Sequence, residues 1–237
     1  MSGRRPMFPI GVVVLAAMAV GCGASASRGE VTVLAAASLT DAFTEMGDAF
    51  SRANPGARVR FNFGPSSGLA TQIDQGAPAD VFASADEGVM GEVAEDGAVT
   101  AAASTFARNS LEIAVPAGNP GGVTGLSDLA RDDLLIGLCA EQVPCGRLAR
   151  RLLSQVDLAA VPDTNEADVR ALLTKIEAGE LDAGLVYRTD VKVAGDRVQG
   201  IETDEDPPVV TSYPIAPLAG SANPHLARAY VDFVLSP

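Results

Sequence analysis

The sequence predicts an α/β fold made of two halves with a cleft between them. After residue 30, apolar strand patterns and amphipathic helix patterns alternate in a βαβαβα rhythm, which is typical of a largely parallel sheet covered by helices. A second set of strands and helices follows, and a late strand and helix return to the first half. Two strands, near 107–111 and 211–215, are therefore expected to cross the cleft as hinges.

The first half is expected to contain three strands, each followed by a helix. In order, these are strand 31–36, helix 39–53, strand 57–64, helix 69–77, strand 79–86 and helix 87–97. Apolar residues such as Phe43, Met46 and Phe50 recur at helical spacing, while residues 57–64 alternate with period two. Gly76 and Pro78 are typical signals for the end of the second helix.

The second half carries the remaining pattern. The expected elements are strands 110–116 and 134–139, helices 144–156 and 166–179, strand 182–190, and then the returning strand 209–220 and helix 225–236. The acidic stretch "ETDEDPP" indicates a solvated loop. We assign residues 31–107 to lobe 1, residues 108–212 to lobe 2 and residues 213–237 to a return into lobe 1.

The N-terminus has the layout of an export signal over residues 1–21. Arg4 and Arg5 precede an apolar run that is shorter than the roughly 20 residues of a membrane-spanning helix. The following "AVGC" resembles a lipobox, which implies a lipidated Cys22 and a tether over residues 22–30. An uncleaved anchor is the alternative, and both place the body outside the cytoplasm, on the outer face of the membrane.

The charge of the chain excludes some partners. Without residues 1–21 it has 15 cationic and 30 acidic side chains, a formal charge of −15. Such a surface repels nucleic acid and anionic lipid. With three tyrosines and no tryptophan, the chain also lacks the aromatic platforms of sugar or single-strand binders. We expect a monomer that takes a small ligand.

Two cysteines remain once Cys22 is assigned to lipid. Cys139 and Cys145 lie six positions apart, in a compartment where disulfides persist. A disulfide is favoured, with free thiols as the alternative. A metal site is not expected, because the one histidine, His225, lies far away in sequence.

Four places share an arrangement in which a strand or loop ends and a helix begins. Ser38 and Ser66 precede helix patterns, Cys145 follows Pro144 at the start of another, and Val169 lies early in a fourth. A helix start offers free N–H groups and a fractional positive pole, so it can hold an anion without a cationic side chain.

Each of these signals also has a purely structural explanation. Ser38 and Asp41 form a possible helix-capping pair, and "SSG" from residue 66 is a turn sequence. Tyr187 in "LVY" is typical of a sheet edge. Only the combination of these residues argues for a binding site.

That combination resembles the molybdate-binding proteins of ABC importers. The resemblance is carried by "VTVLAAASLTDAF", "SSGLATQIDQGAPADVFASAD", "VPCG", "DVRALL" and "LVY" in that order, and spans nearly all of residues 31–237. It implies a type II periplasmic-binding-protein-like fold, in which each lobe is a mixed, mainly parallel sheet flanked by helices. It also implies an unhydrated tetrahedral oxyanion in the cleft.

The resemblance further implies which residues hold the anion. Ser38 and Ser66 would each contribute a hydroxyl and an amide, Cys145 and Val169 an amide, and Tyr187 its hydroxyl. It implies a membrane permease as partner, no cofactor and no enzymatic activity. The chain departs from the family at Cys145, commonly alanine there, and at its end "FVLSP", where relatives usually continue through another short helix.

The physical chemistry of the ligand agrees with such a cage. Molybdate and tungstate are fully deprotonated near neutral pH and offer only acceptors, so donors without a carboxylate suit them. Phosphate keeps a proton, and only Asp41 and Asp168 are near enough in sequence to accept it. Donors at a fixed radius would also reject the smaller sulfate. The sequence does not separate molybdate from tungstate.

Two other classes of function stay open. One is a binding protein for another oxyanion, such as sulfate or thiosulfate. The other is a hydrolase with Ser38 or Cys145 as nucleophile and His225 as base, although no "GxSxG" motif is present. A ferric-binding protein would need more tyrosines and anionic ligands than this chain supplies.

Overall fold

The computed structural model describes residues 29–236. The predicted signal segment 1–21 and Cys22 lie outside these residues, as does most of the tether assigned to 22–30. The first strand begins at Gly29, so the last two tether residues belong to the sheet instead. Within the described part, no helix is both long and apolar enough to span a bilayer.

Nine strands and seven α-helices make up the described fold. The strands are β1 (Gly29–Ala36), β2 (Ala57–Gly64), β3 (Val81–Ala83), β4 (Ser104–Pro116), β5 (Ile136–Cys139), β6 (Thr164–Glu166), β7 (Ala183–Tyr187), β8 (Val198–Ile201) and β9 (Val210–Pro217). The helices are α1 (Thr40–Ala53), α2 (Ser66–Asp74), α3 (Glu87–Glu95), α4 (Pro144–Gln155), α5 (Val169–Glu177), α6 (Arg188–Ala194) and α7 (Pro224–Leu235). Three short 3-10 turns, η1 (Ala37–Leu39), η2 (Leu126–Ala130) and η3 (Gly195–Arg197), complete the described elements.

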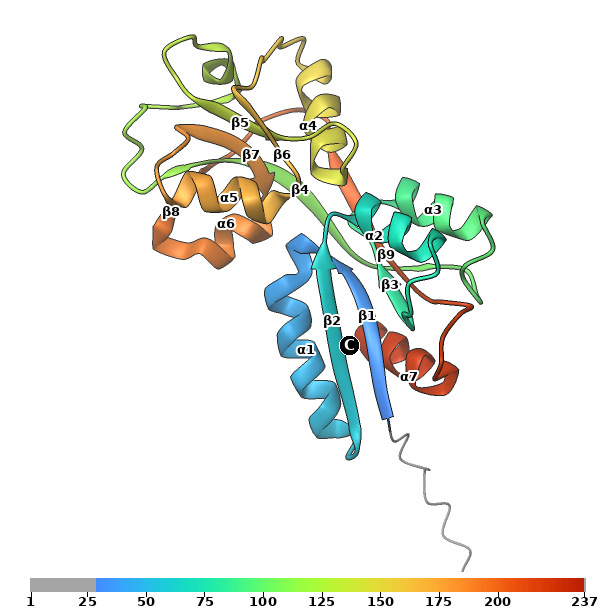
Figure 1. The fold of residues 1–237 in the computed structure, drawn as a ribbon. Coiled ribbons are helices and arrows are strands. Elements are labelled where there is room, and N and C mark those ends of the chain that lie inside the picture. The colour runs from blue at the N-terminus through green and yellow to red at the C-terminus, as the bar shows by residue number, and fades with distance from the viewer. Residues whose placement is uncertain (1–28, 237) are drawn as a thin grey trace, which may run out of the picture.

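Two long strands run between the lobes, as expected from the sequence (Figure 1). The strand order is β2-β1-β3-β9-β4-β7-β5-β6, with β8 beside β4. From Ser104 to Ser110, β4 pairs with β9; from Leu111 onward it pairs with β7 and β8. The change of partner at residues 110 and 111 makes β4 a continuous link between the lobes. The residue boundaries of the lobes given above stay predictions.

Parallel pairing is found among the strands that do not cross between the lobes. In lobe 1, β1 pairs in parallel with β2 and β3, and in lobe 2, β5 pairs in parallel with β6 and β7. Each antiparallel pairing between the strands above involves β4 or β9. The carboxyl ends of the parallel strands therefore form one edge in each lobe, where helices begin and ligands bind in such folds.

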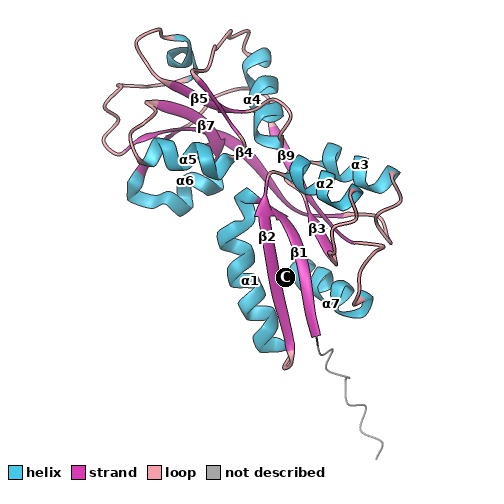
Figure 2. Ribbon diagram, in the orientation of Figure 1, coloured by secondary structure: helices cyan, strands magenta, loops and turns pink. Residues whose placement is uncertain are grey.

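Lobe 1 is a sheet between two layers of helices (Figure 2). Side chains alternate along β1, so Val31 and Val33 face the core shared with α1 and α7, whereas Leu34 faces the core under α2 and α3. In the first of these cores, Phe50 packs edge-on against Tyr230 of α7, with ring centroids 5.3 Å apart. Burial on both faces fixes the register of β1 and hence the place where it ends.

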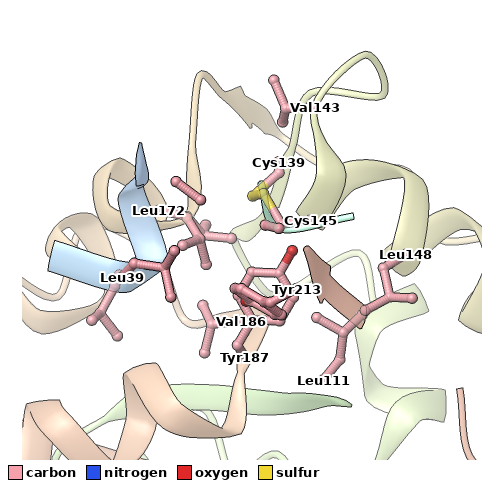
Figure 3. Close-up of a cluster of buried hydrophobic side chains, with 14 of the residues drawn as sticks. Leu39, Leu111, Cys139, Val143, Cys145, Leu148, Leu172, Val186, Tyr187 and Tyr213 are labelled. Carbon is pink, nitrogen blue, oxygen red and sulfur yellow. A yellow bond between two sulfur atoms is a disulfide. The ribbon is translucent and has the colours of Figure 1, made fainter. Parts of the chain in front are cut away.

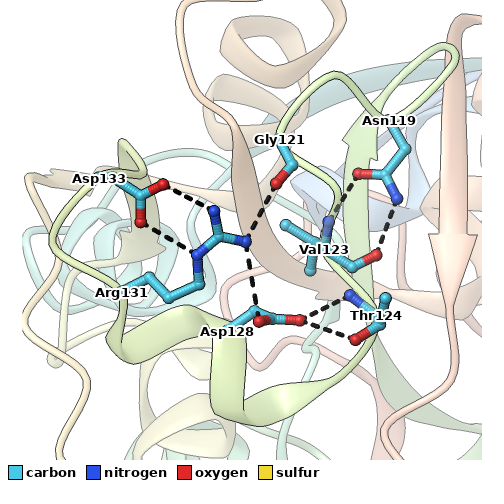
Figure 4. Close-up of polar contacts among 7 residues, drawn as sticks. All are labelled: Asn119, Gly121, Val123, Thr124, Asp128, Arg131 and Asp133. Atoms are coloured by element: carbon cyan, nitrogen blue, oxygen red, sulfur yellow. Dashed lines mark hydrogen bonds and ion pairs between the residues drawn. The ribbon is translucent and has the colours of Figure 1, made fainter.

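A polar network orders the connection between β4 and β5 in lobe 2 (Figure 4). The guanidinium of Arg131 donates to both carboxylate oxygens of Asp133, at 3.0 and 2.7 Å, and to the carbonyl of Gly121 at 3.1 Å. Asp128 accepts from the amide and hydroxyl of Thr124, and these hydrogen bonds lower its pKa. These side-chain hydrogen bonds stabilise the connection between β4 and β5, which contains little regular secondary structure.

The structure differs from the sequence prediction in several elements. The helix expected at 69–77 is α2, which begins at Ser66, so Ser66 lies in the first turn and Pro65 is the N-cap. The helix expected from 166 begins at Val169, because Glu166 pairs in the short strand β6. Strand β7 ends at Tyr187, and α6 and β8, which were not predicted, follow it. The elements β6, α6 and β8 are three to seven residues long, which is too short for periodicity to identify them.

Gly146 allows α4 to start against the end of β5. A β-carbon at this position would lie 1.9 Å from the carbonyl oxygen of Ala140 and 2.8 Å from that of Cys139. We predict that Gly146→Ala lowers the free energy of unfolding by about 1–3 kcal/mol or more, because backbone atoms must move. Urea unfolding measures this.

Gly91 of α3 provides the matched control, because a β-carbon there would meet nothing within 4 Å. Gly91→Ala is expected to raise stability by up to about 1 kcal/mol through helix propensity. Equal effects of the two substitutions would contradict the close approach at Gly146.

Candidate functional site

The five residues singled out from the sequence lie around one cavity between the lobes. Ser38 and Ser66 follow the carboxyl ends of β1 and β2, whereas Cys145, Val169 and Tyr187 follow or end strands of lobe 2. Residues far apart in the sequence meet because the parallel strands of each lobe end at the same edge. The structure thus places all five side by side.

The cavity is small and carries little charge. Its volume is about 20 Å³, which is room for roughly one small molecule or ion. The other lining residues are apolar or small, apart from Asp168, and no lysine, arginine or histidine of residues 29–236 lines it. A sugar, peptide or nucleotide does not fit this space.

Two helix starts from lobe 2 present free backbone N–H groups. Val143 is the N-cap of α4 and Pro144 occupies its first turn, so the next amide is that of Cys145. Asp168 is the N-cap of α5, and its Oδ1 accepts from the amides of Arg170 and Ala171 at 2.9 and 3.0 Å. The amides of Cys145 and Val169 have no protein acceptor within the described chain.

Ser66 is fully buried, and its hydroxyl is oriented by the protein. Ser66 Oγ accepts a hydrogen bond from the amide of Ala85 at 3.0 Å. Its hydroxyl proton is therefore free to point into the cavity, and its own amide lies in the first turn of α2, where helices lack internal partners.

Ser38 lies in the 3-10 turn η1 and caps no helix. Ser38 Oγ is 3.1 Å from the hydroxyl of Tyr213, and neither η1 nor α1 has a side-chain cap. The alternative of a capping pair with Asp41 is wrong, because the carboxylate of Asp41 pairs with Arg170. Tyr213, which contacts Ser38 but does not line the cavity, was not singled out by the sequence analysis.

Tyr187 is a buried residue at the end of an interior strand, not an aromatic of a sheet edge (Figure 3). Among residues 29–236 its hydroxyl has no hydrogen-bond partner, and burial raises its pKa well above the usual value, which keeps it a donor. Its ring packs edge-on against Tyr213, with centroids 5.8 Å apart. An unpaired hydroxyl in the cavity wall is available to a ligand with acceptor atoms.

A disulfide joins Cys139 and Cys145 in the structure (Figure 3). It links the end of β5 to the first turn of α4 and is buried. The bridge fixes the loop that carries the Cys145 amide. It also occupies the thiol that a cysteine nucleophile would need.

The base of the hydrolase alternative, His225, does not lie at the cavity. His225 lies exposed in the first turn of α7 and is not among the residues that line the cavity. No nucleophile and base of the kind considered above therefore come together at Ser38 or Cys145.

Two ion pairs connect the lobes beside the cavity. Arg170 of α5 contacts Asp41 of α1 at 2.8 Å, and Arg147 of α4 contacts Asp86, the N-cap of α3. The Nε of Arg147 donates to Asp86 at 3.1 Å while the other Asp86 oxygen accepts from the amide of Val89. Their side chains are partly exposed, so each pair is worth at most about 1 kcal/mol. Both guanidinium groups are thus held on carboxylates of lobe 1.

Comparison with known proteins identifies the family. Residues 31–237 match the family model of the bacterial extracellular solute-binding proteins. The chain belongs to this family.

Relatives of this solute-binding protein agree in sequence and fold. The molybdate-binding protein ModA of Mycobacterium tuberculosis is 41% identical over 204 residues, which cover 86% of this chain and 78% of the relative. The periplasmic molybdate-binding protein of Azotobacter vinelandii superposes with a TM-score of 0.75 at 20% identity, over 87% of this chain and 93% of that chain. The sulfate-binding protein SubI of M. tuberculosis has a TM-score of 0.77 at 18% identity, over 88% and 82%.

These similarities bear on the fold as well as the family. The two structural matches share less than 25% of their residues with this chain, so they show the fold alone. That fold is the type II periplasmic-binding-protein architecture of two α/β lobes, as expected from the sequence.

Asp190 is a buried acid beside the site of this solute-binding protein. Its Oδ2 accepts from the amide of Tyr187 at 3.3 Å, and burial raises its pKa to about 7. Between pH of about 4 and 7, the folded chain thus holds a proton that the unfolded chain releases. Stability is expected to fall across this window as pH rises, by up to about 1.4 kcal/mol per pH unit, and to level off above it.

Asp190→Asn should remove this dependence, since an amide does not titrate and keeps an oxygen for the Tyr187 amide. Urea unfolding at pH 5, 6, 7 and 8 measures the slope. Asp133→Asn is the control: hydrogen bonds to Arg131 lower the pKa of this exposed acid, so it should leave the slope unchanged. The same slope in the Asp190 variant and the wild type would contradict the assignment.

Proposed function

We propose that this protein captures molybdate, and also tungstate, between its lobes as the substrate-binding component of an ABC importer. The observation that carries the proposal is the convergence of five donor residues from both lobes on a small cavity without a cationic side chain. The 41% identity to a protein named as molybdate-binding supports it.

The donors suit a dianion that has only acceptor atoms. Ser38 and Ser66 would each supply a hydroxyl and an amide, Cys145 and Val169 would supply amides, and Tyr187 its hydroxyl. Hydrogen bonds to a charged partner contribute roughly 1.5–3 kcal/mol each, which together offset the loss of hydration. Because the helix starts and hydroxyls of each lobe are fixed before the ligand arrives, little reorganisation is required within a lobe.

Other oxyanions fit the site less well. Sulfate is smaller, so its oxygens would not reach all of the donors at their fixed positions. Phosphate carries a proton at neutral pH and needs an acceptor. The candidate acceptor is Asp168, whose Oδ1 is already occupied by two helix amides.

Delivery follows from the two-lobe arrangement. The serines belong to lobe 1 and the other three residues to lobe 2, so a ligand meets both sets only when the lobes are closed. The closed form would dock on a membrane permease. Lipidation of Cys22 would hold the protein on the outer face of the cell membrane, as a monomer.

Thermal melting with four anions tests the ligand. A ligand at 100 times its dissociation constant adds about 2.7 kcal/mol of stability. Molybdate and tungstate are expected to raise Tm, with sulfate and phosphate well behind. Equal shifts for all four anions, or none for molybdate and tungstate, would refute the proposed specificity. A phosphate shift as large as that of molybdate would assign Asp168 as an acceptor.

Ser38→Ala tests the site itself. Ser38 caps no helix and is only partly buried, so the loss of its bond to Tyr213 should lower the stability without ligand by no more than about 1 kcal/mol, whereas molybdate should bind about 10- to 100-fold more weakly in calorimetry. Ser66→Ala is the contrasting variant. It leaves the buried Ala85 amide without its acceptor and should lower both the unliganded stability and the affinity. Unchanged affinity in the Ser38 variant would remove this residue from the site.

A further inference from the structure

A chain of side-chain hydrogen bonds on the two crossing strands leads to Ser38. The hydroxyl of Tyr213, on β9, lies 3.1 Å from Ser38 Oγ. Asn109, on β4, reaches the same hydroxyl with its Nδ2 at 3.4 Å. The three residues are far apart in sequence, and Tyr213 is buried. None of the binding contacts proposed above uses Asn109 or Tyr213.

The orientation of the Asn109 amide is determined by its neighbours. Its Oδ1 accepts from the backbone amide of Ser110 at 3.1 Å, and an N–H can only donate. The atom on the other side of the amide is therefore Nδ2, which donates to the hydroxyl oxygen of Thr189 at 2.8 Å and to that of Tyr213. Asn109 thus presents only donors to Tyr213.

The direction of the next bond follows from this arrangement. Tyr213 accepts from Asn109, so its single proton is left for one of the two hydroxyl oxygens that face it, those of Ser38 and Tyr187. Of these, only Ser38 Oγ lies within hydrogen-bond distance. Burial raises the pKa of Tyr213, so that proton stays in place at neutral pH. Once Ser38 Oγ accepts from Tyr213, the Ser38 proton is free to point into the cavity.

Ser66 shows the same arrangement with a different donor. Its hydroxyl oxygen accepts from the Ala85 amide, which leaves its proton for the cavity. The Tyr213 hydroxyl thus does for Ser38 what a backbone N–H does for Ser66. Both serines are thus oriented as donors to the cavity, and they follow the neighbouring strands β1 and β2.

We propose that Tyr213, oriented by Asn109, is a positioning residue that fixes the Ser38 hydroxyl as a hydrogen-bond donor and so tunes the site to oxyanions that offer only acceptors. The inference rests on the proposed function, because it assigns how one contact of that site is set. It adds a determinant of specificity that does not itself touch the ligand.

A double-mutant cycle on molybdate binding tests the inference. The four proteins are the wild type, Tyr213→Phe, Ser38→Ala and the double variant, measured by titration calorimetry. Tyr213→Phe keeps the ring and its packing but is expected to weaken binding about 5- to 20-fold. If Tyr213 acts through Ser38, the double variant should bind within about twofold of Ser38→Ala alone. A purely structural role would instead give additive losses, which would overturn the proposal.

A second pair of variants tests the direction of the chain independently of Tyr213. In Asn109→Asp, a carboxylate accepts from Tyr213, so the Ser38 proton turns toward Tyr213 and Ser38 presents a lone pair to the anion. Thr189→Asp places the same charge on the exposed neighbouring residue but keeps Asn109 as a donor. Asn109→Asp is expected to weaken molybdate binding at least tenfold more than Thr189→Asp, and equal losses would overturn the proposed direction.

The wild-type titration separates this inference from the proposed function. If the wild type binds no molybdate, the proposed function fails. If the wild type binds molybdate and Tyr213→Phe binds it equally well, the positioning role alone fails.

Discussion

The site depends on backbone N–H groups that the fold leaves without partners, among the residues described, in a small cavity between the lobes. An unpaired buried N–H costs free energy, so a fold accepts several of them in one place only where an acceptor is to be bound. The surrounding residues limit their number: Pro144 has no N–H, and the Asp168 carboxylate takes up two amides of α5. What stays exposed to the cavity is a set of neutral donors from both lobes. Such a set gives the acceptor atoms of an anion the hydrogen-bond donors that water would otherwise provide.

The crossing strands make the two halves of this donor set depend on each other. Because β4 pairs first with β9 and then with β7, any change in the angle between the lobes must be absorbed near residues 110 and 111. Asn109 lies at this point and pairs with Thr211 of β9, two residues before Tyr213, so the chain that orients Ser38 lies at the hinge. The disulfide and the close approach at Gly146 make the α4 side of the cavity stiff by comparison.

The parts of the fold that depend on local sequence pattern could be predicted, whereas short elements and long-range contacts could not. Periodicity located long elements such as β1, β2 and α1. Helix-start signals selected Ser38, Ser66, Cys145 and Val169, and the family resemblance added Tyr187; the structure brings all five together. Periodicity missed β6, α6 and β8, which are too short to show a period. The Ser38–Tyr213 contact joins residues 175 positions apart, and no local sequence pattern near Tyr213 predicts a contact with η1. Asp41 was considered as a cap because capping is local, whereas its actual partner, Arg170, lies in the other lobe.

The ion pairs between the lobes have a consequence for how an acidic protein meets a dianion. Arg170 directly follows Val169, and Arg147 lies two residues after Cys145, yet both guanidinium groups are turned to carboxylates of lobe 1. Separation of the lobes would break both pairs and unmask two cations beside the helix starts. In an open cleft the lobe 2 wall would then carry two unpaired cations and the lobe 1 wall the unpaired carboxylates of Asp41 and Asp86, so a dianion would be attracted first to the helix starts of lobe 2. Closing would neutralise the charges on both walls. Recruitment and retention would rely on different forces, with long-range charge acting before closure and short-range dipoles after it.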